Sequence, residues 1–203
     1  MNLKAIFFTA LFTALFVVGM TTFTLAQSLS YQVDVEKSKL DWEGHRFFGG
    51  MHTGNIHLQS GQLNVSDGQL ISGVFQIDMN RIEVTDISGE PAERLTAHLK
   101  TDDFFDVENH PYATFTLKHI DYADEKLAAI VGEISIRGIS QQISFPAEIT
   151  TEGDQLRAVA RGIRVDRTVH DSQYGSINFF RDLGRKIVHN EFVLHVELLA
   201  TKK

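Results

Sequence analysis

The chain contains no cysteine, only three prolines and one tryptophan among its 203 residues. Without cysteine it can form neither a disulfide nor a lipid-modified cysteine anchor, and it offers no thiolate to a metal. It also has no run of Lys or Arg, and its formal net charge is −7. This acidic balance argues against a nucleic-acid partner and against charge-driven binding to anionic lipid surfaces.

Residues 1–26 have the composition of a secretory signal peptide. Lys4 is the only charge, an apolar stretch follows, and Thr24 and Ala26 place small residues at the cleavage positions. The alternative is an uncleaved anchor, because the uncharged stretch 5–25 is long enough to span a bilayer. Threonines dilute this stretch, and no positive cluster follows it. We therefore predict export, cleavage after Ala26 and no stable membrane anchor in the mature protein.

Removal of the leader leaves 177 of the 203 residues, with 18 basic and 26 acidic side chains and a formal charge of −8. This length suits one domain over residues 27–203. A chain of this size buries roughly 70% of its unfolded surface, so it needs no metal or disulfide to fold.

Apolar and polar residues alternate with the period of a β-strand along much of this domain. Segment 73–79 places Phe75, Ile77 and Met79 on one face and Gln76 and Asp78 on the other. Similar segments lie at 31–35, 40–43, 51–58, 62–65, 113–118, 128–136, 143–149 and 190–198. The dipeptide at 67–68, Asp-Gly, is typical of a tight hairpin. Without βα alternation, the pattern predicts an antiparallel sandwich or barrel and does not separate the two.

Two short helices are expected. One contains Pro91 in its first turn and runs to about Lys100, and the other lies near residues 177–183. Between the first helix and the strand that follows Pro111 stand Phe104 and Phe105, which we expect to pin this helical insertion to the sheet.

No residue pattern predicts catalysis or a metal site. The nine histidines include no H-E-x-x-H motif, and His52 and His57 would face opposite sides of a continuous strand. His189 and His195 would share a face, but His189 lies near a strand start. The carboxylates of Asp102, Asp103 and Asp106 are expected to cap backbone amides at a turn. No nucleophile elbow or phosphate-binding loop is present. We predict no catalytic residue, no metal and no cofactor.

The order of motifs resembles the YceI-like family of lipid- and polyisoprenoid-binding proteins. Residues 98–115, HLKTDDFFDVENHPYATF, are similar to the family's HLKSDDFF segment and the strand that follows it. GVFQIDM at 73–79, GEISIRG at 132–138, ISFP at 143–146 and EFVLHVEL at 191–198 match further family motifs in order, and the late loop with Asp166, Tyr174 and Phe179 is also similar. Two departures occur, because 169–171 reads Val-His-Asp where a basic or aromatic residue and a glycine are expected, and Asn190 replaces a common Asp.

This resemblance implies an extended, antiparallel, eight-stranded, lipocalin-like barrel with a short helical insertion. It implies that part of the interior is an elongated apolar tunnel that holds a long-chain isoprenoid or other apolar lipid in the periplasm. A homodimer is left open. The expected apolar contacts are Trp42, Phe75, Ile77, Met79, Phe115, Ile134, Phe145, Phe179 and Phe180. Arg167 and Tyr174 are the expected polar contacts at the barrel mouth, although Arg167 is equally suited to pair with Asp166.

Two alternative functions are kept. One is an enzyme, a hydrolase or isomerase that acts on a lipophilic substrate in the same cavity and needs two titratable groups pointing inward. The other is an envelope stress or adhesion protein with a solid core. An inward His–Asp pair would favour the enzyme, and a filled interior would favour the stress or adhesion protein.

Overall fold

The computed structural model describes residues 28–181, 184 and 187–203. The leader at 1–26 lies outside the described residues, so its cleavage stays a prediction. The elements in chain order are β1 (Leu29–Val33), β2 (Lys39–Arg46), β3 (Met51–Ser66), β4 (Gln69–Val84), α1 (Glu90–Leu99), β5 (Tyr112–Tyr122), β6 (Leu127–Ile136), β7 (Ile139–Glu152), β8 (Gln155–Asp166), the 3-10 helix η1 (Arg167–His170) and β9 (Val188–Lys202). None of the helices in these described ranges is long and apolar enough to cross a membrane.

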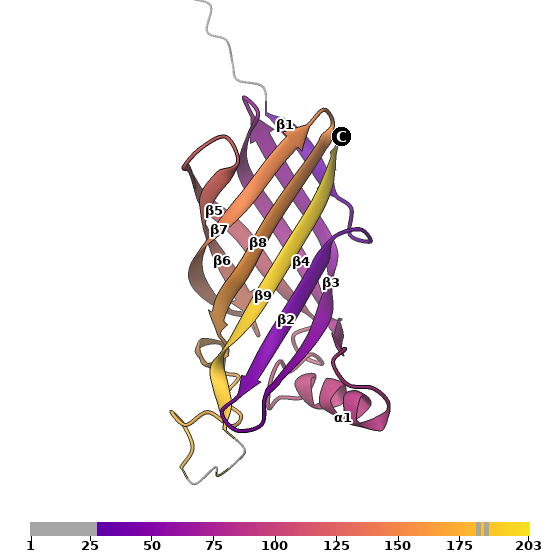
Figure 1. Ribbon diagram of the computed structural model, residues 1–203, viewed down its shortest axis with the longest axis vertical. Helices are drawn as coiled ribbons and strands as arrows, with labels where there is room; N and C mark the ends of the chain where they lie inside the picture. Colours follow the sequence, from indigo (N-terminus) through magenta and orange to yellow (C-terminus); the bar gives the residue numbers. More distant parts are fainter. Residues whose placement is uncertain (1–27, 182–183, 185–186) are drawn as a thin grey trace, which may run out of the picture.

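The strands form one closed antiparallel barrel, which is elongated in the direction of its tilted strands (Figure 1). Each strand from β3 to β8 pairs with the next one along the chain, and α1 with its loops forms the connection between β4 and β5. Both β1 and β2 close the barrel between β3 and β9. The predicted all-β barrel with one helical insertion is therefore confirmed, and the sandwich is excluded.

Strands β1 and β2 occupy a single position in the barrel, one after the other. Tyr31 of β1 lies opposite Leu63 near one end of β3, and Trp42 of β2 lies opposite Gly54 near the other end. Nine strands thus fill eight positions, as the predicted eight-stranded barrel requires. A closed sheet of this size has no free edge and leaves room for one small or elongated ligand.

Two strands differ from their predicted form because of β-bulges. Segments 51–58 and 62–65 belong to the single strand β3, in which the register shifts three times against β4. Strand β8 was not predicted, because its alternation breaks between Ala160 and Ile163, where Gly162 adopts φ 70°. A bulge adds one residue and inverts the inside–outside pattern beyond it, so periodicity alone missed this strand.

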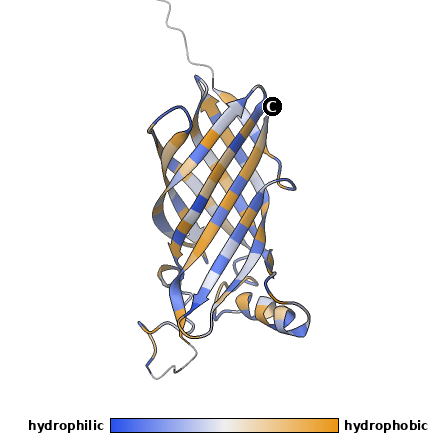
Figure 2. Cartoon of the chain, in the orientation of Figure 1, coloured by the Kyte–Doolittle hydropathy of each residue, from blue (hydrophilic) through white to orange (hydrophobic). Residues whose placement is uncertain are grey.

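Hydrophobic and hydrophilic residues alternate along several strands (Figure 2), and buried positions recur at every second residue over 73–79 of β4 and along β6, as predicted. On β4, Phe75, Ile77 and Met79 are buried, whereas Val74 is 55% exposed. At the β3–β4 turn, Asp67 and Gly68 both adopt positive φ, 51° and 80°, which is the conformation expected of an Asp-Gly hairpin.

The helical insertion has the predicted extent, with Pro91 in the first turn of α1. The second predicted helix is wrong in its described part, because residues 177–181 form turns and a bend; Leu183 lies outside the described residues. A 3-10 helix, η1, forms earlier in this loop instead. Asp171, which ends η1, adopts φ 60°, a left-handed conformation that favours glycine, so its position agrees with the glycine that the resemblance led us to expect.

The prediction that the aspartates after α1 cap backbone amides is wrong for Asp103 and Asp106. Asp103 accepts a hydrogen bond from the His98 ring at 2.8 Å, and Asp106 accepts one from the Asn109 side-chain amide at 2.9 Å. The turn is held instead by backbone hydrogen bonds such as the one from the Asp106 amide to the Thr101 carbonyl.

Candidate functional site: an apolar cavity at one end of the barrel

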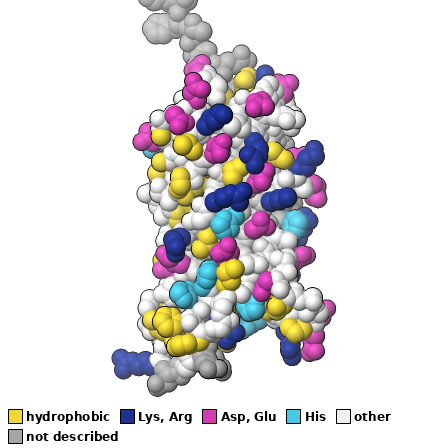
Figure 3. Space-filling model, viewed as in Figure 1, with side chains coloured by type: hydrophobic (Ala, Val, Ile, Leu, Met, Phe, Trp, Pro, Cys, Tyr) yellow, Lys and Arg dark blue, Asp and Glu magenta, His cyan; other side chains and the backbone are white. Residues whose placement is uncertain are grey.

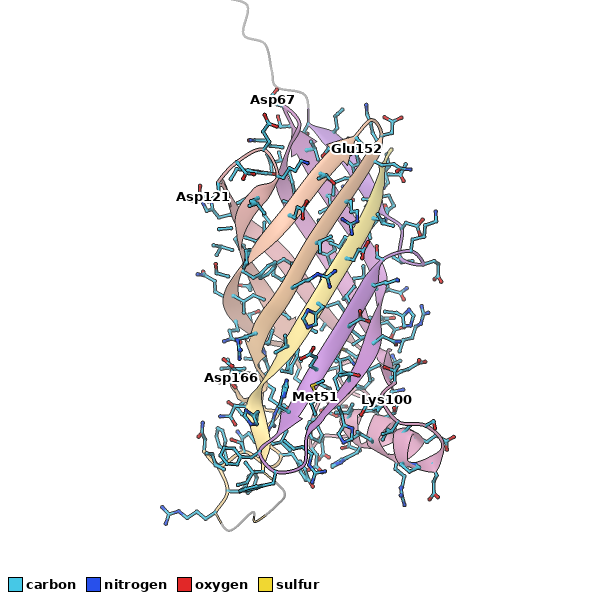
Figure 4. All side chains as sticks on the ribbon, viewed as in Figure 1. Met51, Asp67, Lys100, Asp121, Glu152 and Asp166 are labelled. Carbon is cyan, nitrogen blue, oxygen red and sulfur yellow. The ribbon has the colours of Figure 1, made fainter. Side chains whose placement is uncertain are left out.

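A cavity of about 270 Å³ lies inside the barrel at the end where β2 finishes and β3 and β9 begin, here called the mouth end. Its walls come from inward positions of β2, β4, β6 and β9, from α1 and from the loops beside η1. Figure 4 labels Met51, Lys100 and Asp166 toward this end, and Asp67 and Glu152 at the opposite end. Exposed residues Arg46 and His189 line the cavity at its outer limit.

A second cavity of about 100 Å³ adjoins the first deeper in the barrel, and its lining residues are all apolar. Four residues, Leu40, Ile77, Ile134 and Leu194, border both cavities. Along β4 the lining passes from Phe75, in the second cavity only, through Ile77 to Met79, in the first only. The interior is therefore partly hollow along its length, with a waist at the four shared residues.

Three phenylalanines line the deeper cavity. The ring centroids of Phe75 and Phe115 are 6.2 Å apart, and those of Phe115 and Phe145 are 5.8 Å apart. Gly132 of β6 makes room for Phe115, since an added Cβ there would lie 2.1 Å from its Cζ. The glycine therefore lets an aromatic ring lie flat on the strand, where it narrows the interior.

The Trp42 ring is positioned in the same manner at the mouth end. An added Cβ at Gly54 would lie 2.5 Å from Cζ2 of Trp42, and the indole Nε1 donates to the Asn55 carbonyl oxygen at 3.2 Å. A buried tryptophan needs a partner for its N–H, and this hydrogen bond fixes the apolar face of the ring against the large cavity.

The helical insertion forms one wall of the large cavity, which the sequence analysis missed. Leu95 and Leu99 of α1 line it together with Phe104 and Phe105. Both phenylalanines are buried, and the Phe105 ring packs edge-on against Phe192 of β9, with centroids 6.1 Å apart. Phe104 and Phe105 do pin the insertion to the barrel, but their inner faces also border the cavity. The HLKTDDFF segment is the sequence signal for this double role.

Arg167 lines the large cavity although its side chain is almost fully buried, with 3% exposure. Its guanidinium donates to the backbone carbonyls of Ser172 at 2.5 Å, His189 at 3.0 Å and Val188 at 3.3 Å. Burial lowers its pKa to about 10, which still leaves it charged at neutral pH, and the nearby charge of Asp166 opposes this shift.

The alternative in which Arg167 pairs directly with Asp166 is not what the structure shows. The Asp166 carboxylate accepts hydrogen bonds from the Thr168 amide at 2.9 Å and the Thr168 hydroxyl at 2.6 Å, and so caps η1. Arg167 therefore ties the loop after η1 to the start of β9 and leaves a buried positive charge beside the cavity. Its guanidinium also lies 5.7 Å from the Phe104 ring centroid.

Three histidines line the large cavity, and two of them, His98 and His52, each contact an aspartate. His98 Nε2 lies 2.8 Å from Asp103 Oδ2, and His52 Nδ1 lies 3.0 Å from Asp86 Oδ2. Neither aspartate lines the cavity, and the Asp103 side chain is 51% exposed. The pairs thus lie at the outer edge of the site and not inside it. His57, as predicted, is not on the face of β3 that carries His52.

The Asp86 carboxylate stays ionised in this position. Partial burial raises its pKa, but hydrogen bonds from the Thr53 amide and the His52 ring outweigh this, and the net direction is downward. Its role is visible in the structure, since it ties the chain after β4 to the start of β3 through Thr53 at 3.1 Å. His98 is held differently, with its ring edge-on to Tyr174 at 4.8 Å and to Phe104 at 5.1 Å.

Most of the predicted contact residues border one of the two cavities. Trp42, Met79, Arg167 and Tyr174 line the large one, Phe75, Phe115 and Phe145 line the deeper one, and Ile77 and Ile134 line both. Phe179 and Phe180 line neither and are 49% and 47% exposed. Whether any of these side chains contacts a ligand stays a prediction.

Within the described ranges, no group of three or more His, Cys, Asp or Glu side chains is placed to hold a metal ion. His195 and His45 both contact the Glu43 carboxylate, at 3.1 and 3.4 Å, on the outer face of the barrel, and these three residues form a polar surface cluster.

The sequence model of the YceI-like domain matches residues 31–200, which is most of the chain. The chain therefore belongs to the YceI-like family. It is 28% identical over 172 residues to a UPF0312 protein of Pectobacterium carotovorum, with 81% of this chain and 86% of that protein covered. A UPF0312 protein of Photorhabdus laumondii is 26% identical over 122 residues, but the match spans only 61% of that relative and 60% of this chain.

Two solved structures share the fold. BcnA of Burkholderia cenocepacia superposes with a TM-score of 0.66 at 20% identity, over 83% of this chain and 99% of that one. A polyisoprenoid binding domain from Saccharophagus degradans, implicated in plant cell wall breakdown, gives 0.65 at 16% identity, over 86% and 99%. At these identities the similarity establishes the barrel and its insertion.

Proposed function

We propose that this protein binds and carries a long apolar lipid, isoprenoid-like in character, inside its barrel. The observation that carries this proposal is the pair of adjoining cavities, of about 270 and 100 Å³, of which the deeper has an entirely apolar lining. A structural neighbour described as a polyisoprenoid binding domain supports the same ligand class. A partly hollow interior also speaks against the solid core of an adhesion or stress protein.

The mechanism is burial without chemistry. Each methylene moved from water into an apolar interior contributes about 0.8 kcal/mol before the costs of ordering the chain. The polar end of the ligand lies at the mouth end, where Arg167, Tyr174 and His98 line the cavity. The buried charge of Arg167 supplies a positive potential there, while its donors remain bound to backbone carbonyls.

The experiment is native mass spectrometry of the mature protein purified from cells, followed by organic extraction and identification of what is released. We expect a mass excess over the polypeptide, and a released molecule with a long hydrocarbon chain. Protein that is free of ligand, and that takes up no long-chain lipid when one is supplied, would contradict the proposal.

The second candidate is a hydrolase or isomerase acting on a lipophilic substrate, favoured by the His98–Asp103 contact at the cavity edge. Its two groups do not both face the interior, which weakens this candidate. Prolonged incubation with the extracted lipid separates the two functions. A carrier returns the lipid unchanged, whereas an enzyme converts it at a rate that falls when His98→Gln is introduced.

We further propose that the mature protein acts in the periplasm. The support is the composition of residues 1–26, with one charged residue before an apolar stretch and small residues at 24 and 26. Carriage of a water-insoluble lipid has a clear use there, because the lipid would otherwise have to cross an aqueous compartment unaccompanied.

A further inference from the structure

The mouth end of the barrel carries an unusual set of exposed apolar side chains. Six of the eleven large apolar residues that are exposed in the described chain lie in two segments: 44–51, which contains the β2–β3 loop, and 172–181, which follows η1. We call these six the aromatic rim: Phe47, Phe48, Met51, Ile177, Phe179 and Phe180, which are between 47% and 59% exposed. Every exposed phenylalanine among the described residues belongs to it.

The two segments are joined to each other and to the cavity. The Phe47 amide donates to the Ile187 carbonyl at 3.0 Å, and the Phe47 ring stacks on the cavity-lining His189 with centroids 5.8 Å apart. On the other side, the Val188 amide donates to the Gly175 carbonyl at 2.9 Å. The two segments therefore both contact the start of β9 beside the cavity, and Figure 3 shows hydrophobic side chains exposed at this end of the molecule.

The charge of the rim differs from that of the rest of the molecule. The whole chain has 26 acidic residues against 19 basic ones, yet segments 44–51 and 172–181 contain no Asp or Glu. They contain Arg46, Arg181 and His45. Counted over the sequence, 44–51 and 172–187 together hold four Lys or Arg residues, 46, 181, 185 and 186, against one acidic residue, Asp182. An anionic surface that would repel most of this acidic protein thus meets an excess of basic residues in these stretches.

We propose that the aromatic rim docks the mouth end onto a phospholipid bilayer. Aromatic side chains with an apolar body prefer the boundary between headgroups and acyl chains, and membrane binding grows with the apolar area that is inserted. Basic groups beside them are attracted to anionic headgroups. With the rim inserted, the cavity faces the acyl chains, and a lipid passes between bilayer and barrel without crossing water. This last step rests on the proposed function, whereas the docking itself does not.

The test is co-flotation of the mature protein with vesicles of phosphatidylethanolamine and phosphatidylglycerol. The rim variant is Phe179→Ser with Phe180→Ser. The matched control is Ile71→Ser with Val74→Ser, because these two side chains of β4 are 50% and 55% exposed on the barrel wall. We expect the wild type and the control to float with the vesicles, and the rim variant to lose roughly tenfold in bound fraction, since binding scales with inserted apolar area.

Three outcomes would overturn the inference. The first is wild-type protein that does not float, and the second is an equal loss in the control and the rim variant. The third is a concentration-dependent dimer in sedimentation velocity that the rim variant abolishes, which would make the rim an interface between two copies. Native mass spectrometry of the same variant separates the two proposals. If the rim variant keeps its lipid but no longer floats with vesicles, docking is supported. If it loses both the lipid and flotation, the rim belongs to the lipid-binding cavity and docking is overturned.

Discussion

Ile77 stands where the two cavities meet, and it is 7% exposed. We predict that Ile77→Trp fills the waist, weakens retention of a long apolar lipid and leaves the protein folded, because the added ring enters empty space. In a solid core the same change would cost about 1–3 kcal/mol through overpacking. Melting temperature and lipid retention should be measured together on the ligand-free and loaded protein.

The neighbouring Gln76 supplies the control for this prediction. Successive side chains on a strand point to opposite faces, so Gln76→Trp places the same ring outside the barrel. It should change neither lipid retention nor melting temperature by much. Strong destabilisation of ligand-free Ile77→Trp would mean that the waist is filled, and loss of lipid from Gln76→Trp alone would reverse the assignment of faces.

His170 is fully buried, and its Nδ1 donates to the Ile139 carbonyl at 2.8 Å, so Nε2 bears the lone pair of a neutral ring. Nε2 has no hydrogen-bond partner. Burial lowers the pKa of His170 below its ordinary value of 6.5, against the opposing effect of the Ile139 carbonyl. As the pH falls, His170 is therefore protonated in the unfolded chain before it is protonated in the folded one. The contribution of neutral His170 to the stability of the fold is complete above about pH 6.5 and is lost as the pH falls below it.

We predict that His170→Asn reduces this loss, because the Asn amide can still donate to Ile139 but does not titrate. The measurement is the difference in melting temperature between about pH 7.5 and about pH 5, which brackets the ordinary range of histidine. His119→Asn, at an exposed position on β5, should behave like the wild type. If His170→Asn keeps the full wild-type difference, the acid sensitivity comes from other groups.

At the scale of elements, one side chain at the β6–β7 turn contacts both the helical insertion and the end of η1. Arg137 Nη1 donates to the carbonyls of Asp102 at 2.8 Å, Phe104 at 3.0 Å and Asp171 at 3.0 Å. We predict that Arg137→Ala lowers the free energy of unfolding by about 1.5–3 kcal/mol, the usual contribution of hydrogen bonds to a charged group. It should also speed lipid release, since the cavity wall is loosened.

Arg157 provides the comparison. It forms a two-nitrogen contact with the Glu197 carboxylate on the outer barrel face, at 2.9 and 3.1 Å. An exposed ion pair of this kind contributes up to about 1 kcal/mol, so Arg157→Ala should be mild and should leave lipid release unchanged. If Arg137→Ala and Arg157→Ala have equal effects on denaturant unfolding and on the rate of lipid release, then Arg137 has no special role in holding the insertion.

Alternation predicted the stretches that contain no bulge, such as residues 73–79 of β4 and strand β6, because a period of two assigns faces directly. It did not reveal β8, where the bulge at Gly162 changes the phase, nor could it join the two halves of β3. The cavity residues that lie on strands were predicted for the same reason, because alternation shows which side chains of a strand point inward. Phe104 and Phe105 were assigned to packing alone, since their second contact depends on a wall that only the folded insertion creates.

At the scale of the whole molecule, the composition of residues 1–26 supports a prediction of export. We predict that N-terminal sequencing of protein from the periplasmic fraction begins at Gln27, after removal of residues 1–26. The physical reason is the apolar stretch that ends in small residues at positions 24 and 26. Intact leader in the membrane fraction would instead establish the anchor that was considered as an alternative.

Because β1 and β2 share one position in the barrel and both pair with β9, the enclosed cavity exists only once β9 is in place. Strand β9 is the last to be synthesised, and it is the partner of both β1 and β2 as well as of β8. Until it is in place, the other strands form an open sheet without an enclosed interior. The two ends of the chain must therefore meet before a lipid can be held, so loading is a property of the finished chain, and a nascent chain cannot sequester lipid during its own synthesis.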